Sequence, residues 1–206
     1  MQFSLFDSNS NYNAVIAAQS GSGKSFFTNE LILCALEEGA QVWIIDVGRS
    51  YQNLAESLNG DFIAFGSADS PGLNPFVSLR DWNEEADLIT GLMTAMVAPR
   101  EPLSDFQSAV LKQTLQNLYE SKGSSLTIDQ VAASLIGSSD LRIRDLGSQL
   151  YPFTSRGEYG HYFNRPDALS FRSDLTVLEL EELKGRRHLQ QVVLLELILA
   201  IQQSMY

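Results

Sequence analysis

The sequence predicts an α/β fold in which a mainly parallel sheet is interrupted by an all-helical insertion. Short apolar runs, typical of buried parallel strands, alternate with segments of helical periodicity over residues 14–65. Residues from about 80 to 155 then carry only helical patterns, and one more apolar strand pattern follows at 175–180. We therefore expect one α/β domain with extra helices between its strands.

The first predicted elements are a strand, a glycine-rich loop and a helix. Residues 14–18 form an apolar run that predicts a strand, and a loop of glycine and serine follows it. Apolar residues then recur at helical spacing from Phe26 to Ala35, and Gly39 suits a left-handed cap at the end of that helix. A second strand is predicted at 41–46. The order strand, helix, strand predicts a parallel βαβ unit.

The remaining elements follow from the same periodicities. A helix is predicted from Leu54, and a capping box from Thr127 to Gln130 is predicted to begin another. A long apolar helix from Leu189 to Tyr206 meets no Gly, Pro or polar stop signal, so we expect the chain to end inside a domain. Further strands are predicted at 61–65 and 175–180, and further helices at 84–97, 104–120 and 141–150.

Composition excludes several classes of protein. The chain has a net charge of −11, so we do not expect this segment to bind DNA directly through release of counterions. One cysteine and two histidines exclude an internal disulfide and a Cys/His zinc site. No apolar run reaches the ~20 residues of a membrane span, and residues 1–13 lack a secretion signal pattern. These features predict a cytoplasmic protein.

Residues 18–25 fit a Walker A phosphate loop in its relaxed form, with Ala18 where the strict pattern has glycine. Glycines let successive N–H groups turn toward a phosphate, and the following helix adds partial positive charge. Lys24 is the candidate catalytic residue because its ammonium group can reach the β- and γ-phosphates, and Ser25 is the candidate Mg²⁺ ligand. A glycine turn with a surface lysine is the alternative interpretation. The predicted ATP-binding residues are Ser20, Gly21, Ser22, Gly23, Lys24, Ser25 and Phe26.

A phosphate loop also needs an acidic partner for Mg²⁺ or its water. Asp46, at the end of the strand 41–46, is one candidate and joins the predicted nucleotide-binding residues; a turn residue at a strand end is the alternative. Glu179 or Glu181, at the end of the strand 175–180, is the other candidate, although a solvated charge run over 179–182 is the favoured interpretation there. Three arginines could reach the phosphate of a neighbouring subunit, with surface solvation as the simpler interpretation: Arg156, Arg186 and Arg187.

Five motifs occur in a fixed order at residues 13–27, 46–51, 73–76, 157–163 and 179–183. Together they resemble the motor domain of the TraC family, the conjugative-transfer ATPases of F-type type IV secretion systems, which are related to the VirB-type secretion ATPases. The resemblance covers nearly the whole chain. It implies a RecA-like P-loop NTPase core that works as a hexamer with other type IV secretion components. Such a motor lies in the cytoplasm, peripheral to the inner membrane through its partners.

The resemblance also implies that residues 1–206 are a partial C-terminal ATPase domain, with a helical insertion at about 80–155. In the family, the Walker B strand with its Asp-Glu pair follows the helix that here reaches Tyr206. We therefore expect a segment truncated before Walker B that binds ATP and hydrolyses it poorly. The intact motor would power pilus assembly and substrate transfer. The alternatives are a DNA-translocating ATPase of the HerA/FtsK kind, a small-molecule P-loop kinase, and a subunit that binds ATP without turnover.

Overall fold

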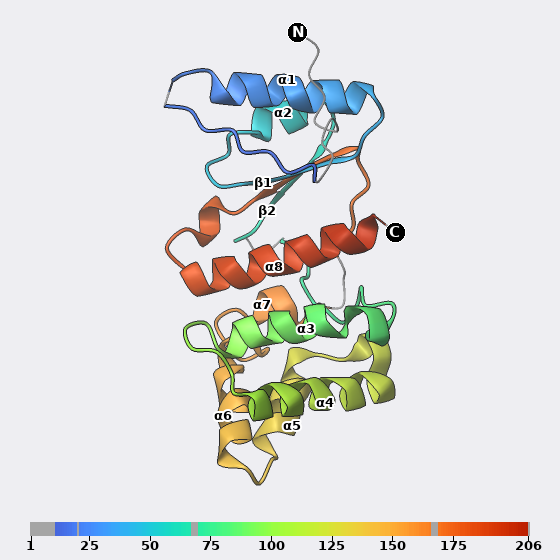
Figure 1. Cartoon of the computed structure of the whole chain (residues 1–206), viewed down its shortest axis with the longest axis vertical. Helices are drawn as coiled ribbons and strands as arrows, with labels where there is room; N and C mark the ends of the chain where they lie inside the picture. The colour runs from blue at the N-terminus through green and yellow to red at the C-terminus, as the bar shows by residue number, and fades with distance from the viewer. Residues whose placement is uncertain (1–10, 20, 67–69, 166–168, 206) are drawn as a thin grey trace. The chain divides into compact units, whose positions relative to one another are not determined.

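The structure of the chain is a computed structural model that describes residues 11–19, 21–66, 70–165 and 169–205 (Figure 1). The chain divides into two compact units, residues 1–42 and 43–206, and each unit is described by itself. The first unit holds helix α1 (Lys24–Glu37) and the residues that lead into it. The second unit holds a small sheet and all the other helices.

In the first unit, residues 11–19 form no strand, so the strand predicted at 14–18 is wrong. A β-strand needs backbone hydrogen bonds to a neighbouring strand, and the sheet of the described residues contains only three strands from later in the chain. The prediction for the end of the following helix is confirmed. Gly39 has a φ of 82°, and its N–H donates to the carbonyl of Leu36 at 3.0 Å.

The sheet of the second unit has the strand order β1-β3-β2, with β1 at Val42–Asp46, β2 at Asp61–Ala64 and β3 at Leu175–Glu179. β2 and β3 are parallel, with Asp61 opposite Thr176 and Ala64 opposite Glu179. All five residues of β3 are buried, as expected for a central strand covered on both faces. The three strand predictions for these segments are therefore confirmed to within one residue at each end.

Helices fill the chain between β2 and β3, and the four longest agree with the predicted segments, whereas the short helix α7 was not predicted. The capping box at the start of α5 is confirmed, because the side chain of Gln130 accepts the N–H of Thr127 at 3.3 Å. The α-helices are α2 (Gln52–Ser57), α3 (Trp82–Val97), α4 (Asp105–Lys122), α5 (Ile128–Ile136), α6 (Leu141–Gln149), α7 (Gly160–Phe163) and α8 (Arg187–Ser204). Short 3₁₀ helices lie at Gly123–Ser125, Tyr151–Phe153 and Glu181–Leu183.

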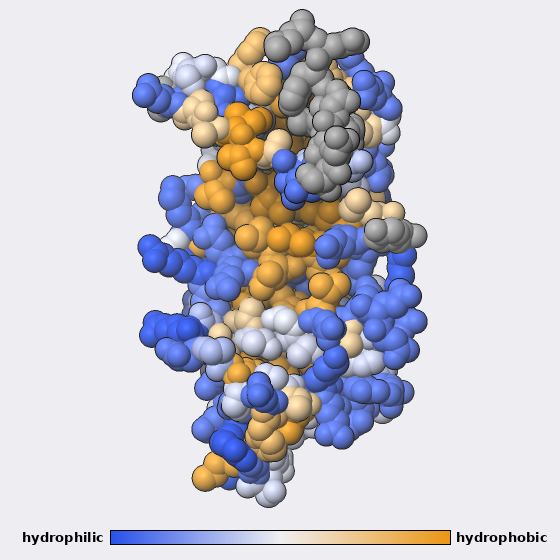
Figure 2. All heavy atoms as spheres, viewed as in Figure 1, coloured by the Kyte–Doolittle hydropathy of each residue, from blue (hydrophilic) through white to orange (hydrophobic). Residues whose placement is uncertain are grey.

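One apolar core joins the sheet of the second unit to its helices. Leu178 of β3, Leu197 of α8 and Met93 of α3 are fully buried in the same cluster. Helix α8 packs on α3 and lies between the sheet and α3 (Figure 1). Its outer face is apolar as well, and apolar residues gather around this part of the molecule in Figure 2. The exposed apolar residues of α8 are Leu194, Leu195 and Ile198.

Within the described residues, no helix combines the length and the apolarity needed to cross a bilayer.

Glu196 of α8 is an ionisable residue that is buried among the apolar residues of the core. Its side chain lies on the buried face of the helix and is only 5% exposed. Its Oε2 atom has no hydrogen-bond partner among the described residues. Burial raises the pKa of this carboxyl from its ordinary 4.5 to about 8, because the ionised form loses its hydration. Glu196 is therefore mostly protonated at neutral pH.

Candidate nucleotide-binding site

The phosphate loop is a tight turn that leads into α1. Gly21 and Gly23 have φ angles of 80° and 88°, in the left-handed region that residues with side chains rarely adopt. Ser22 fixes the turn, because its N–H and its hydroxyl both donate to the carbonyl of Gln19, at 3.2 and 2.7 Å. The backbone conformation of this loop therefore requires glycine at two of the predicted positions.

The N-terminus of α1 is suited to an anion. Its N-cap residue is Gly23, so no side chain caps the first free N–H groups of the helix. The first turn contains no acidic residue, and Lys24 is exposed within it. The partial positive charge of the helix end and the ammonium group of Lys24 act together at this point. This arrangement favours binding of phosphate groups.

A pocket of about 610 Å³ lies at this loop, within the range of typical small-molecule sites. Five of the residues predicted to bind the nucleotide line it: Gly21, Gly23, Lys24, Ser25 and Phe26. Ser22 braces the turn, and Ser20 lies outside the described residues. The remaining lining residues are Ala18 and Gln19.

The residues of this loop fit ATP with Mg²⁺. Uncapped N–H groups and a lysine are the donors that phosphate oxygens need. The hydroxyl of Ser25 is a hard oxygen ligand, and Mg²⁺ commonly takes its other ligands from phosphates and water. No group of three His, Cys, Asp or Glu side chains in the described part of the chain is placed to hold a metal ion by itself. The individual roles of Lys24 and Ser25 stay predictions.

Asp46 lies in the second unit, at the carboxyl end of β1. Its Oδ2 atom accepts the N–H of Ser50 at 2.6 Å, so the side chain closes the turn that follows the strand. The carbonyl of Asp46 accepts the N–H of Leu180 at 2.9 Å, which ties this turn to the end of β3. The observed contacts of Asp46 are thus those of a turn residue. Its contact with the nucleotide stays a prediction.

Glu179, the last residue of β3, holds the same turn from the other side. Its carboxylate accepts the N–H groups of Gly48 at 3.2 Å, Arg49 at 2.6 Å and Glu181 at 2.8 Å. The side chain is fully buried, so the interpretation of residues 179–182 as a solvated charge run is wrong for this residue. Three charge-assisted hydrogen bonds compensate for burial of the carboxylate. The sequence signal for a buried, hydrogen-bonded Glu179 was its position within the apolar strand pattern at 175–180.

The turn between β1 and α2 is strained at Arg49, which has a φ of 56°. The Glu179 carboxylate holds the backbone N–H of Arg49, and its guanidinium pairs with Glu182. Three other arginines were proposed to act on a neighbouring subunit. The Nε atom of Arg186 lies 4.0 Å from Oε1 of Glu158, and the side chains of Arg156 and Arg187 are exposed. Action of these three on a neighbour's phosphate stays a prediction.

Comparisons with known proteins agree with the fold and the phosphate loop. A family model described as the TraG P-loop domain matches residues 6–128. Protein TraC of Escherichia coli (strain K12) is 29% identical over 211 residues, which cover 96% of this chain and 24% of TraC. The solved structure of VirB4 of Thermoanaerobacter pseudethanolicus matches with a TM-score of 0.75 at 17% identity, covering 91% of this chain and 55% of that one.

The likeness to VirB4 confirms the predicted fold class, an α/β P-loop fold with a mainly parallel sheet. The chain spans about a quarter of the length of the curated relative and about half of the solved one.

Proposed function

The chain belongs to the TraG P-loop domain family, and from this premise we propose that it is the ATP-binding segment of a type IV secretion motor ATPase. The observation that carries the proposal is the phosphate loop, with two left-handed glycines and an uncapped helix end beside Lys24. The similarity to TraC and the likeness in fold to VirB4 support the secretion context.

In this proposal, the N–H groups of residues 21–25 and the ammonium group of Lys24 bind the phosphates of ATP. Lys24 also neutralises the charge that develops on the transferred phosphoryl oxygens. The Ser25 hydroxyl holds Mg²⁺ against the nucleotide. Bound Mg²⁺·ATP supplies the phosphoanhydride bond whose hydrolysis releases energy for mechanical work.

We propose further that residues 1–206, a partial C-terminal ATPase domain, bind ATP but turn it over slowly. The related motors are expected to activate water with an Asp-Glu pair, and no Asp-Glu dipeptide occurs in these 206 residues. The intact protein would form a hexamer with other secretion components, on the cytoplasmic side of the inner membrane. It would drive pilus assembly and substrate transfer. The net charge of −11 argues against a DNA grip in this segment.

Isothermal titration with ATP and Mg²⁺ tests the proposal. The unmodified chain should bind Mg²⁺·ATP, and Lys24→Ala should abolish binding because phosphate charge is no longer neutralised. Lys122→Ala, which removes an exposed lysine from the last turn of α4, is the matched control and should bind normally. Ser25→Ala should lower the affinity only when Mg²⁺ is present. Unchanged affinity in Lys24→Ala would refute the assignment of the phosphate loop.

Duplex DNA, titrated at low and high salt, gives a separate test. We expect no salt-sensitive binding to this segment, whereas a DNA-translocating segment would show it.

A further inference from the structure

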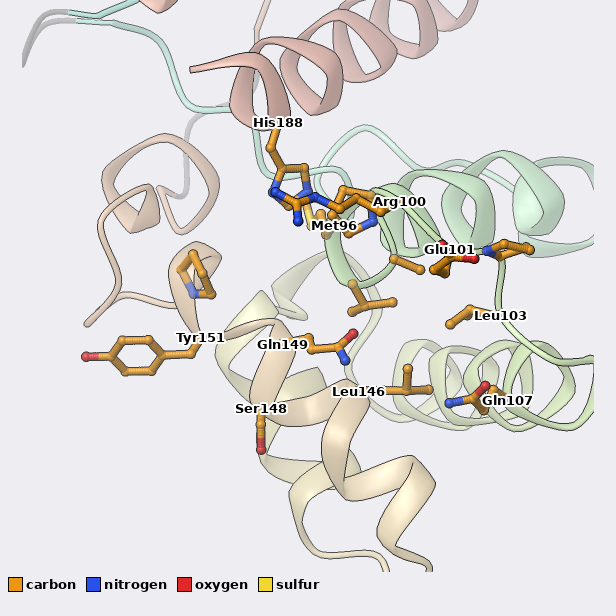
Figure 3. A pocket seen from close by; sticks show the side chains of 15 residues that line it. Met96, Arg100, Glu101, Leu103, Gln107, Leu146, Ser148, Gln149, Tyr151 and His188 are labelled. Carbon is orange, nitrogen blue, oxygen red and sulfur yellow. The ribbon is translucent and has the colours of Figure 1, made fainter. Parts of the chain in front are cut away.

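The second unit contains two chemical features that the predicted nucleotide site does not use. One is a groove of about 650 Å³, whose rim carries an arginine and a glutamate side by side (Figure 3). Because Arg100 and Glu101 oppose one another in charge, the groove favours neither an acidic nor a basic ligand. The other feature is the dipeptide Asn59–Gly60 between α2 and β2, and its chemistry is specific.

Asparagine followed by glycine is the dipeptide in which deamidation is fastest. Glycine has no side chain to keep its backbone nitrogen away from the carboxamide of the preceding residue. No other asparagine in the sequence precedes a glycine. Asn59 is also exposed, so water can reach the carboxamide. The sequence and the exposure of this residue both favour chemical modification at Asn59.

The reaction needs no enzyme or cofactor. The backbone nitrogen of Gly60 gives up its proton and forms a bond to Cγ of Asn59. The bond from Cγ to Nδ2 breaks, and the –NH₂ group leaves as ammonia with the proton that Gly60 lost. Water then opens the cyclic imide at one of its two carbonyls. Opening at Cγ gives aspartate, and opening at the main-chain carbonyl gives isoaspartate, in which the main chain runs through Cβ and Cγ.

The folded chain restrains the nitrogen that must attack. The N–H of Gly60 donates to the carbonyl of Ala55 at 2.8 Å, which is the long-range bond of a Schellman cap at the end of α2. Asn59 has a φ of 53° and takes the left-handed position of this cap. The nitrogen of Gly60 must leave Ala55 before it can attack Cγ of Asn59. Each reaction therefore requires the end of α2 to open.

Helix α2 is suited to such opening. It has only six residues, and Ala55 is the single buried residue among them. Helices of this length are not stable by themselves in water, and helix ends open at a small fraction of the free energy of global unfolding. The folded state therefore slows the reaction at Asn59 without preventing it.

The isoaspartate product does not fit the sheet as it stands. It lengthens the main chain by one atom directly before β2, where Asp61 pairs with Thr176 of β3. There is no room for a shift at Gly60, because a Cβ atom on this residue would lie 2.7 Å from the carbonyl oxygen of Leu175. The added atom must therefore move β2 relative to β3.

A shift of β2 also reaches the turn after β1. The N–H of Phe65, directly after β2, donates to the carbonyl of Glu179 at 3.0 Å. The carboxylate of the same Glu179 holds the N–H groups of Gly48 and Arg49. The ends of all three described strands are thus linked through Glu179 to the position of β2.

We propose that Asn59 is a site of spontaneous deamidation, where opening of the end of α2 lets Gly60 form the imide and the isoaspartate product uncouples β2 from β3. The modification is separate from ATP binding and does not rest on the assignment of the phosphate loop.

Incubation of the chain at neutral pH, in buffer and in urea that unfolds it, tests the proposal. Peptide mapping by mass spectrometry follows deamidation at each asparagine, and isoaspartyl methyltransferase labels isoaspartate. In urea, Asn59 should react faster than any other asparagine. In buffer, the same product should form about 10–100 times more slowly, because the helix end must first open. Glu56→Gly, an exposed change within α2, should speed the reaction about fivefold in buffer and leave it unchanged in urea.

Hydrogen exchange measures the effect on the sheet. Amides of residues 61–65 should exchange about tenfold faster in the isoaspartate form than in fresh protein. Fresh Asn59→Asp carries the same added charge on a normal main chain and should exchange as slowly as the unmodified chain does. Aged Asn59→Gly cannot deamidate at this position and should do the same.

Three results would each overturn the proposal. The first is an equal rate at Asn59 in buffer and in urea, and the second is absence of isoaspartate at Asn59 in buffer when the urea sample has reacted completely. The third is unchanged exchange of residues 61–65 in the isoaspartate form.

Discussion

Replacing the buried carboxyl of Glu196 by an amide should stabilise the protein at alkaline pH. The pKa of this group is raised by burial from 4.5 to about 8, so the folded state holds its proton more tightly than the unfolded state does. Stability is therefore lost as the pH rises from the unfolded pKa toward the folded one. Above that window the group must be ionised while buried, and the penalty stays constant.

The size of the effect follows from the same shift. At 1.36 kcal/mol for each pKa unit, the shift from 4.5 to about 8 corresponds to about 5 kcal/mol when the carboxyl is fully ionised. At neutral pH the penalty is about 3 kcal/mol, since the folded state is still mostly protonated there. Glu196→Gln has no proton to lose, so its advantage over the unmodified chain should grow with pH.

Urea unfolding followed by far-UV circular dichroism, at about pH 5 and about pH 9, measures this difference. Glu84→Gln is the matched control, because Glu84 is exposed in the first turn of α3 and its replacement should change stability little at either pH. A stability difference between Glu196→Gln and the unmodified chain that does not change with pH would refute the reasoning. So would a lower stability of Glu196→Gln at alkaline pH.

Three further substitutions test other parts of the structure. Glu179→Gln should lower the free energy of unfolding by about 1–3 kcal/mol and speed hydrogen exchange of the turn after β1, because the NH₂ group of the new amide would face backbone N–H donors. The control Glu182→Gln removes only a partly exposed ion pair, so it should lower the free energy of unfolding by less than about 1 kcal/mol. Gly23→Ala should strain the backbone at a residue with a φ of 88° and weaken ATP binding measured by titration. Gly91→Ala is the control, and it should raise the melting temperature because Gly91 is an exposed residue in the middle of α3, where alanine favours the helix more than glycine does. Ser104→Ala should remove the cap of α4 and lower the free energy of unfolding by about 1 kcal/mol.

Local chemistry explains which elements could be predicted from the sequence. The start of α5 is specified by side chains that bond to its own backbone, Thr127 and Gln130, so a four-residue pattern was sufficient. The end of α1 depends on a single left-handed residue, Gly39, and a glycine directly after a helical pattern can be recognised in the sequence. The central strand β3 is recognised by its continuous apolar residues because both of its faces are covered.

Features that depend on distant partners were predicted less well. The apolar run 14–18 has strand composition, but pairing with another strand decides whether a strand forms. Glu179 resembled part of a charged run until the folded chain placed the amides of Gly48 and Arg49 against it. Glu196 appeared only as an interruption of an apolar segment, and its burial follows from the packing of α8 on α3. The phosphate loop was recognisable because its function resides in one continuous segment.

The strand order β1-β3-β2 has a consequence for synthesis of the chain on the ribosome. Of the three strands in the described residues, the two made first are not neighbours, and the strand that separates them begins at Leu175, roughly 110 residues after Ala64. At translation rates of about 5–20 residues per second, that strand arrives roughly 5–20 s later. Helices α3 to α6 can form from local contacts in that interval. The early strands meanwhile lack their shared neighbour, so nascent chains in this state are the ones most exposed to aggregation and to chaperone binding.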